Sequence, residues 1–111
     1  MKVAIIGGNE KHLNIVDKYL MDLIETSGNY LFTVIGGYVG ETGGDPPLSQ
    51  LWASYRGLPF SAKKYKDVGS LMDGVSADAD YIIFLNDGSQ IIKRFIMVYR
   101  QLEKHGSVIN I

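Results

Sequence analysis

Short, largely apolar runs alternate along this chain with longer segments in which apolar residues recur every three or four positions. Residues 3–6, 30–35 and 81–85 are such runs and predict strands. The length and β-branched content of 3–6 predict a strand that is buried on both faces of a sheet. Because parallel neighbours need crossover connections, the alternation predicts a mostly parallel sheet, and right-handed crossovers place helices on both of its faces. We therefore expect an α/β fold, a small Rossmann-like three-layer sandwich with four or five strands.

The amphipathic segments predict three helices. The first ends at Ser27-Gly28-Asn29 and carries the apolar stripe Leu13, Val16, Leu20, Leu23 and Ile24. The second has Asp45 as its expected N-cap and Pro46 and Pro47 in its first turn, and Leu48, Leu51, Trp52 and Tyr55 form its stripe. The third carries Ile92, Phe95, Ile96, Tyr99 and Leu102, widened by Ile91 and Val98. Residues 60–65 predict a short strand near an edge, 66–79 a loop with one helical turn, and 107–111 a last strand.

Composition narrows the class of protein. The 111 residues predict a single domain, 1–111, and the absence of cysteine excludes a disulfide framework and a thiolate metal site. A net charge of −1 does not favour nucleic acid or an anionic membrane as a partner. The N-terminus does not read as a secretory signal, and no apolar run approaches the roughly 20 residues of a membrane span. We expect a soluble, cytoplasmic protein with no metal and no cofactor.

Glycine and small polar residues follow three of the predicted strands, at residues 7–9, 36–45 and 86–89. The carboxyl ends of parallel strands are where ligands of open α/β sheets bind, and each loop leads toward a helix N-terminus, which favours anions. The second loop is longer than the two to six residues of a typical strand-to-helix connection. The expected ligand-binding residues are Gly8, Asn9, Gly36, Gly37, Tyr38, Gly40, Gly43, Gly44, Asp45, Asn86, Asp87, Gly88 and Ser89.

No known phosphate-binding motif is present. Neither G-x-G-x-x-G nor the P-loop pattern occurs, and no lysine or arginine lies between Lys18 and Arg56. We therefore expect backbone N–H groups to bind the phosphate, assisted by a charge from elsewhere. The candidates for that charge are Arg56, Lys63, Lys64, Lys93 and Arg94. Turn, cap and packing roles remain alternatives for Asn9, Asp45, Asn86, Asp87 and Ser89, and Trp52 is expected in the core.

Several short segments, taken in order, resemble the SLOG superfamily, a Rossmann-like group that includes the LOG, YspA-type and DprA-core proteins. They are residues 5–8 (IIGG), 34–37 (VIGG) with Gly44-Asp45 and Leu51-Trp52-Ala53, 57–59 (GLP), 79–84 (ADYIIF) and 87–89 (DGS). The resemblance covers most of the chain. It implies a nucleotide-derived ligand in a pocket formed by the three loops.

Some of these relatives cleave the N-glycosidic bond of a nucleoside 5′-monophosphate, using a P-G-G-x-G-T-x-x-E motif. Here the corresponding loop, 85–92, reads LNDGSQII and has no glutamate at the catalytic place, and the upstream Arg-Asn pair of YspA-type proteins is missing. The primary hypothesis is therefore binding, sensing or sequestration of a phosphate-containing, nucleotide-derived small molecule. N-glycoside hydrolysis, with Glu41 as the catalytic candidate, and a DprA-like DNA-binding module are the alternatives, so whether the protein is an enzyme stays open. The broad apolar stripe of the third helix predicts a homo-oligomer.

Overall fold

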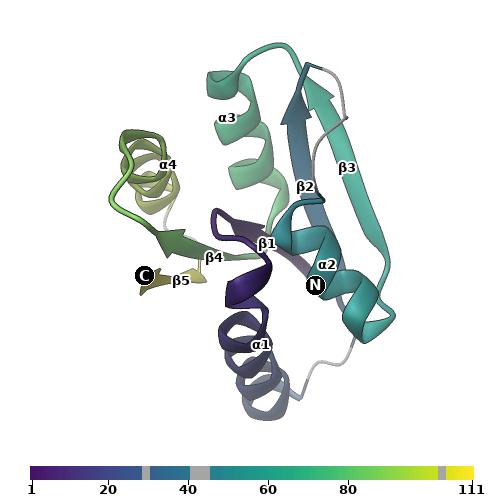
Figure 1. Ribbon diagram of the computed structural model, residues 1–111. Helices are drawn as coiled ribbons and strands as arrows, with labels where there is room; N and C mark the ends of the chain where they lie inside the picture. The colour runs from purple at the N-terminus through teal and green to yellow at the C-terminus, as the bar shows by residue number, and fades with distance from the viewer. Residues whose placement is uncertain (29–30, 41–45, 103–104) are drawn as a thin grey trace.

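Five parallel strands form one sheet in a computed structural model that describes residues 1–28, 31–40, 46–102 and 105–111 (Figure 1). The strands are β1 (Lys2–Ile6), β2 (Thr33–Val39), β3 (Phe60–Tyr65), β4 (Tyr81–Asn86) and β5 (His105–Asn110). Their order across the sheet is β3-β2-β1-β4-β5. Val3 in the central strand pairs with Val34 on one side and Tyr81 on the other. The expected Rossmann-like α/β fold is confirmed.

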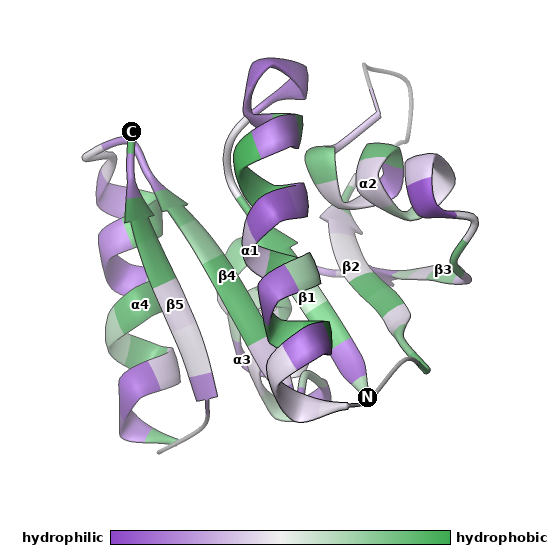
Figure 2. Ribbon diagram, turned by 90° about the horizontal axis from the view of Figure 1, so that it is seen from below, coloured by the Kyte–Doolittle hydropathy of each residue, from purple (hydrophilic) through white to green (hydrophobic). Residues whose placement is uncertain are grey.

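In the described residues, four helices and one short 3₁₀ turn connect the strands. They are η1 (Glu10–His12), α1 (Leu13–Ser27), α2 (Leu48–Arg56), α3 (Val68–Asp78) and α4 (Gln90–Gln101). The helices α1 and α2 cover one face of the sheet, and α3 and α4 cover the other (Figure 1). In Figure 2, green hydrophobic and purple hydrophilic stretches alternate along α1 and α4, whereas β4 is mostly green. The expected placement of helices on both faces is confirmed.

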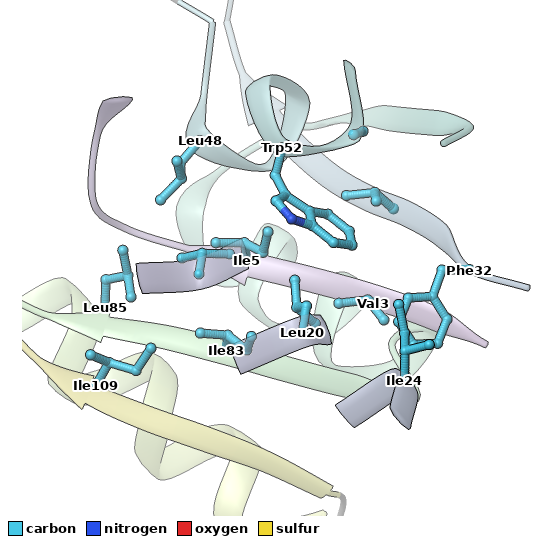
Figure 3. Packing of buried hydrophobic residues seen from close by; sticks show 13 residues of the cluster. Val3, Ile5, Leu20, Ile24, Phe32, Leu48, Trp52, Ile83, Leu85 and Ile109 are labelled. Carbon is cyan, nitrogen blue, oxygen red and sulfur yellow. The ribbon is translucent and has the colours of Figure 1, made fainter. Parts of the chain in front are cut away.

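The core under α1 and α2 is built from side chains that alternate along the strands. Val3 and Ile5 of β1 pack in one cluster with Leu20 and Ile24 of α1 (Figure 3). Trp52 of α2 belongs to the same cluster, and its ring points toward the sheet. Trp52 is fully buried, which confirms that it belongs to the core.

The core under α3 and α4 contains a cluster of aromatic rings. The Phe84 ring lies edge-to-face with the rings of Phe95 and Tyr99, with centroids 5.4 and 5.5 Å apart. Such pairs add about 0.5–1.5 kcal/mol beyond simple burial. Of the predicted α4 stripe, Ile92, Phe95, Ile96 and Tyr99 are buried against the sheet, whereas Leu102 is exposed.

Two elements differ from the expectation. Residues 68–78 form a full helix, α3, which Asp67 caps by accepting a hydrogen bond from the Ser70 N–H at 2.7 Å. Gly69 and Gly74 lower the helical propensity of this segment, but the burial of Met72 and Val75 stabilises it. The helix α2 begins at Leu48, with Pro47 at the N-cap, so both prolines precede the helix instead of forming its first turn.

Candidate functional site

An apolar cavity of about 440 Å³ lies at the carboxyl ends of β1 and β2. Its walls come from every helix except α1: Pro47, Ser49 and Gln50 of α2 and its N-cap, Val68 and Leu71 of α3, and Ile91, Ile92 and Phe95 of α4. The strands and their ends contribute Ile5, Ile6, Gly7, Gly36, Gly37, Tyr38, Phe60 and Ala62. Its size and position match those of ligand sites in open α/β sheets. None of these lining residues is charged.

Gly36 and Gly37 lie inside strand β2, and the prediction that they belong to a loop is wrong. They pair with Ala62 and Lys63 of the edge strand β3, and this ladder extends β2 to Val39. A Cβ on Gly36 would lie 3.4 Å from the Phe60 ring, so the missing side chain leaves the strand bare toward the cavity. Because Gly36 has no side chain, it leaves open space in the cavity next to the backbone of β2.

Gly37 has a packing role on the opposite face of β2. A Cβ there would lie 2.7 Å from the Tyr65 ring, and one on Gly74 of α3 would lie 2.4 Å from the same ring. Tyr65 thus occupies a slot between two glycines. This close packing explains Gly37 without a ligand.

Tyr38 is half-buried near the end of β2, and its expected place in an exposed loop is wrong. It lines the apolar cavity, so stacking of its ring on a flat ligand stays a prediction. Gly40 follows the strand with φ +80°, a conformation that favours glycine, and it lines neither this cavity nor the next one described.

A second cavity of about 490 Å³ lies beside the first, between the β1–η1 turn and the start of α2. Pro47 lines both cavities. The second one is more polar, and its lining residues are Gly8, Asn9, Glu10, Lys11, Pro46, Pro47, Leu48 and Leu51. It therefore brings one cation and one carboxylate to the edge of the apolar cavity.

Asn9 is occupied by local hydrogen bonds. Its side-chain oxygen accepts from the Lys11 N–H at 2.9 Å, and its own N–H donates to His12 Nδ1 at 3.0 Å. Gly8 has φ +73° and a Cβ there would lie 2.2 Å from Leu85 Cδ1. Both residues line the second cavity, but turn geometry and close packing account for their identity; their expected role in ligand binding stays a prediction.

The N-terminal end of α2 stands between the two cavities. Its N-cap residue, Pro47, has no side chain that accepts a hydrogen bond, and the first helical bond runs from the Leu51 N–H to the Pro47 carbonyl at 3.1 Å. Within the part of the chain that the structure describes, the preceding N–H groups of Leu48, Ser49 and Gln50 have no acceptor. An exposed helix N-terminus stabilises an anion by about 0.3–1 kcal/mol.

The turn after β4 is held together by its own side chains. Asn86 Oδ1 accepts from the Gly88 N–H at 3.0 Å, and Asp87 Oδ1 accepts from the Ser89 N–H at 2.9 Å. That backbone N–H holds the pKa of Asp87 below its usual value. Ser89 caps α4 through the Ile92 N–H. These four residues line neither of the two cavities, so turn and cap roles explain them.

Four predicted site residues lie outside the described part of the chain: Glu41, Gly43, Gly44 and Asp45. The catalytic prediction for Glu41 and the phosphate-binding prediction for the two glycines therefore stay predictions. The expected N-cap role of Asp45 is wrong, because Pro47 holds that position.

The cations proposed to assist phosphate binding do not line the apolar cavity. Arg56 lies at the far end of α2, where it forms a salt bridge with Asp17 of α1. The Lys63 Nζ atom lies 3.3 Å from Asp78 Oδ2, and the two side chains form a salt bridge between β3 and α3. Lys64, Lys93 and Arg94 line neither of the two cavities. Among the lining residues of the two cavities, Lys11 is the cation.

Sequence patterns gave no signal for the residues that form most of the cavity wall. Ser49 and Gln50 follow the two prolines in an otherwise ordinary helix start, and Phe60, Leu71 and Ile91 read as core positions. They come together because α2, α3 and α4 all begin at the same edge of the sheet. The proline pair at 46–47 was the available signal, since it marks where α2 begins.

No protein-family model matches this chain, and a search of curated proteins found no match. In the described segments, no three histidine, aspartate or glutamate side chains gather as a metal site would require. No helix in these segments is long and apolar enough to cross a membrane.

Proposed function

We propose that this protein binds a nucleotide-derived, phosphate-containing small molecule at the carboxyl edge of its sheet. The observation that carries the proposal is the uncharged, largely apolar cavity beside an uncapped helix N-terminus. A planar base fits the first feature, and a phosphate fits the second. The SLOG resemblance of the sequence supports the same class of ligand.

The base enters the apolar cavity in this proposal. Its walls include the rings of Tyr38, Phe60 and Phe95, which suit a flat, neutral, polarisable ring. A phosphate buried there would lack a cation, and an unpaired buried charge is costly.

The phosphate then lies at the end of α2, toward the second cavity. The free N–H groups of Leu48, Ser49 and Gln50 donate to it, and Lys11 supplies the cation. Hydrogen bonds to a charged group contribute about 1.5–3 kcal/mol each, more than the helix dipole alone. Glu10, in the same cavity, opposes binding of highly charged ligands and favours a monophosphate over a triphosphate.

Thermal unfolding against a panel of nucleoside mono-, di- and triphosphates, ADP-ribose and cyclic dinucleotides tests the proposal. A ligand at 100 times its Kd adds about 2.7 kcal/mol to stability, which raises the Tm of a domain of this size by several degrees. Lys11→Gln reduces the shift, whereas Lys18→Gln, on the exposed side of α1, serves as the control. No shift with any member of the panel would overturn the proposal.

Mass spectrometry of the same samples separates binding from the alternatives. Recovery of the intact ligand supports a binder, and release of the free base supports the N-glycosidase. A DNA-binding module instead predicts affinity for single-stranded DNA that falls steeply with salt.

A further inference from the structure

Ser49, the second residue of α2, is a buried residue whose hydroxyl faces the apolar cavity. The residue is 3% exposed and lines the cavity. Its Oγ lies 3.7 Å from the point where a Cβ on Gly36 would sit, so it is directed at the bare segment of β2. Within the described residues, no hydrogen bond of this side chain is present, and its oxygen is not sealed from solvent. The hydroxyl is therefore open to whatever fills the cavity.

None of the described residues that line the cavity with Ser49 is charged, so none of them could form a relay with its hydroxyl. Its neighbours across the cavity are the Phe60 ring, the Gly36 backbone and Ala62. A serine hydroxyl in such a place neither activates a nucleophile nor binds a metal. It offers one donor and one acceptor to whatever fills the cavity.

We infer that the Ser49 hydroxyl hydrogen-bonds the polar edge of a nucleobase that lies flat against the bare backbone of Gly36. The inference rests on the proposed function and adds to it the residue that recognises the base. A ring between Phe60 and the α2 end has Ser49 at its rim, because Ser49 and Phe60 both approach Gly36. A purely hydrocarbon ring would leave the hydroxyl unpaired, so the site favours a heteroaromatic ring over a hydrocarbon one.

Gly36 is part of the same arrangement. A Cβ at this position would be in ordinary contact with Phe60 and with Ser49 Oγ, at 3.4 and 3.7 Å, so the fold tolerates a methyl group there. That methyl group would fill the space between Phe60 and Ser49, which the nucleobase needs in order to lie against Gly36. Gly36→Ala is therefore a folded variant that blocks the site.

Calorimetric titration of AMP, GMP, CMP and UMP into wild type, Ser49→Ala and Ser54→Ala tests the inference. Ser54 is an exposed serine on the same helix and serves as the matched control. Loss of one neutral hydrogen bond raises the Kd of the bound nucleotide about tenfold in Ser49→Ala, and Ser54→Ala leaves it unchanged. Anilinonaphthalene sulfonate, an aromatic anion without a base edge, binds wild type and Ser49→Ala equally.

The unliganded Ser49→Ala variant keeps the wild-type Tm, because its hydroxyl has no protein partner to lose. If it fails to fold, Ser49→Cys preserves the size and replaces the hydroxyl by a weak donor, and the same loss of affinity is expected. Equal nucleotide affinity in wild type and variant overturns the role of Ser49 and leaves the proposed function standing. An equal loss for anilinonaphthalene sulfonate also overturns it, because cavity shape would then be responsible. Failure of wild type to bind any of the four nucleotides overturns the inference, and the wider panel described above then decides the proposed function.

Discussion

Arg56 of α2 donates two hydrogen bonds, each 2.6 Å long, to the carboxylate of Asp17 of α1. One turn earlier on α2, the Trp52 Nε1–H donates to the same carboxylate at 3.0 Å. The Asp17 side chain is 19% exposed. This three-residue contact ties the two helices on one face of the sheet together, and it uses a cation that the sequence had suggested for the ligand.

Asp17→Asn weakens this contact and destabilises the protein. The amide keeps one acceptor for Trp52 but presents an N–H group to Arg56, so we expect a loss of about 1 kcal/mol at neutral pH. Urea unfolding measures it. Asp22→Asn, which removes the same charge from the exposed side of α1, is the control and is expected to change stability little.

The stability difference between wild type and Asp17→Asn depends on pH. The hydrogen bond from Arg56 lowers the pKa of Asp17 below its usual 3.8. A lowered native-state pKa contributes stability above the pKa of the unfolded chain, and this contribution is lost as the pH falls through the native value. The difference should therefore be full at neutral pH and shrink below pH 3.8. A difference that stays constant into acid would contradict the ion pair.

Gly74→Ala probes the slot that holds Tyr65. Alanine is favoured over glycine in a helix by about 1 kcal/mol, but its Cβ would lie 2.4 Å from the Tyr65 ring. We expect Gly74→Ala to destabilise wild type and to stabilise the Tyr65→Ala variant. A double-mutant cycle by chemical unfolding measures this change of sign, and equal effects in both backgrounds would show that the ring moves aside freely.

Tyr99 gives the protein a dependence on alkaline pH. Its hydroxyl donates to the His105 carbonyl, and burial raises its pKa from 10.0 to about 12. The folded state favours the neutral phenol of Tyr99. The contribution of Tyr99 to the free energy of unfolding is therefore complete below pH 10 and is lost as the pH rises toward 12.

Tyr99→Phe is therefore less stable than wild type at neutral pH, because the His105 carbonyl loses its hydrogen-bond donor. As the pH rises into the alkaline range, the free energy of unfolding of the variant falls less than that of wild type. The two stability curves should converge between pH 10 and 12 in urea unfolding. Tyr55→Phe, at a 61% exposed position, is the control and should follow wild type throughout. Parallel curves for Tyr99→Phe and wild type would rule out this titration.

Met97→Glu tests the predicted homo-oligomer. The buried part of the α4 stripe is covered by the protein's own sheet, so self-association now depends on exposed side chains such as Met97, which is 63% exposed. Glutamate there lies within one helical turn of Lys93 and Arg100, so the variant keeps its helix. Light scattering at micromolar concentration should find an oligomer for wild type and a monomer for Met97→Glu. A monomeric wild type would show that the prediction is wrong.

Local pattern predicted most elements because each one depends on its neighbours in the sequence. The apolar runs became β1, β2 and β4, and the stripe of Ile92, Phe95, Ile96 and Tyr99 became the buried face of α4. The edge position of the weak strand at 60–65 is also confirmed. The helix α3 escaped detection, because its glycines lower the propensity and its stability comes from contacts with β2 and β3.

The candidate site could not be predicted from local sequence pattern, because it forms through contacts between segments that are far apart in the chain. Gly36 and Gly37 read as loop because glycine has low strand propensity, yet pairing with β3 makes them strand. Sequence spacing also left Asp17 on the polar side of its helix, and only the packing of α2 beside α1 supplied its partners Trp52 and Arg56.

The sequence by itself determined the alternation of the strands with α1, α2 and α4, the parallel α/β class and most of the residues that avoid water, because hydrophobic periodicity and chain connectivity are local properties. Only the tertiary structure decided which glycines face a cavity, which cation forms a salt bridge and which serine hydroxyl faces the cavity. Those outcomes depend on distances between segments far apart in the chain. Ser49 and Gly36 are 13 positions apart in sequence, and they face each other because α2 folds back over the strand that precedes it.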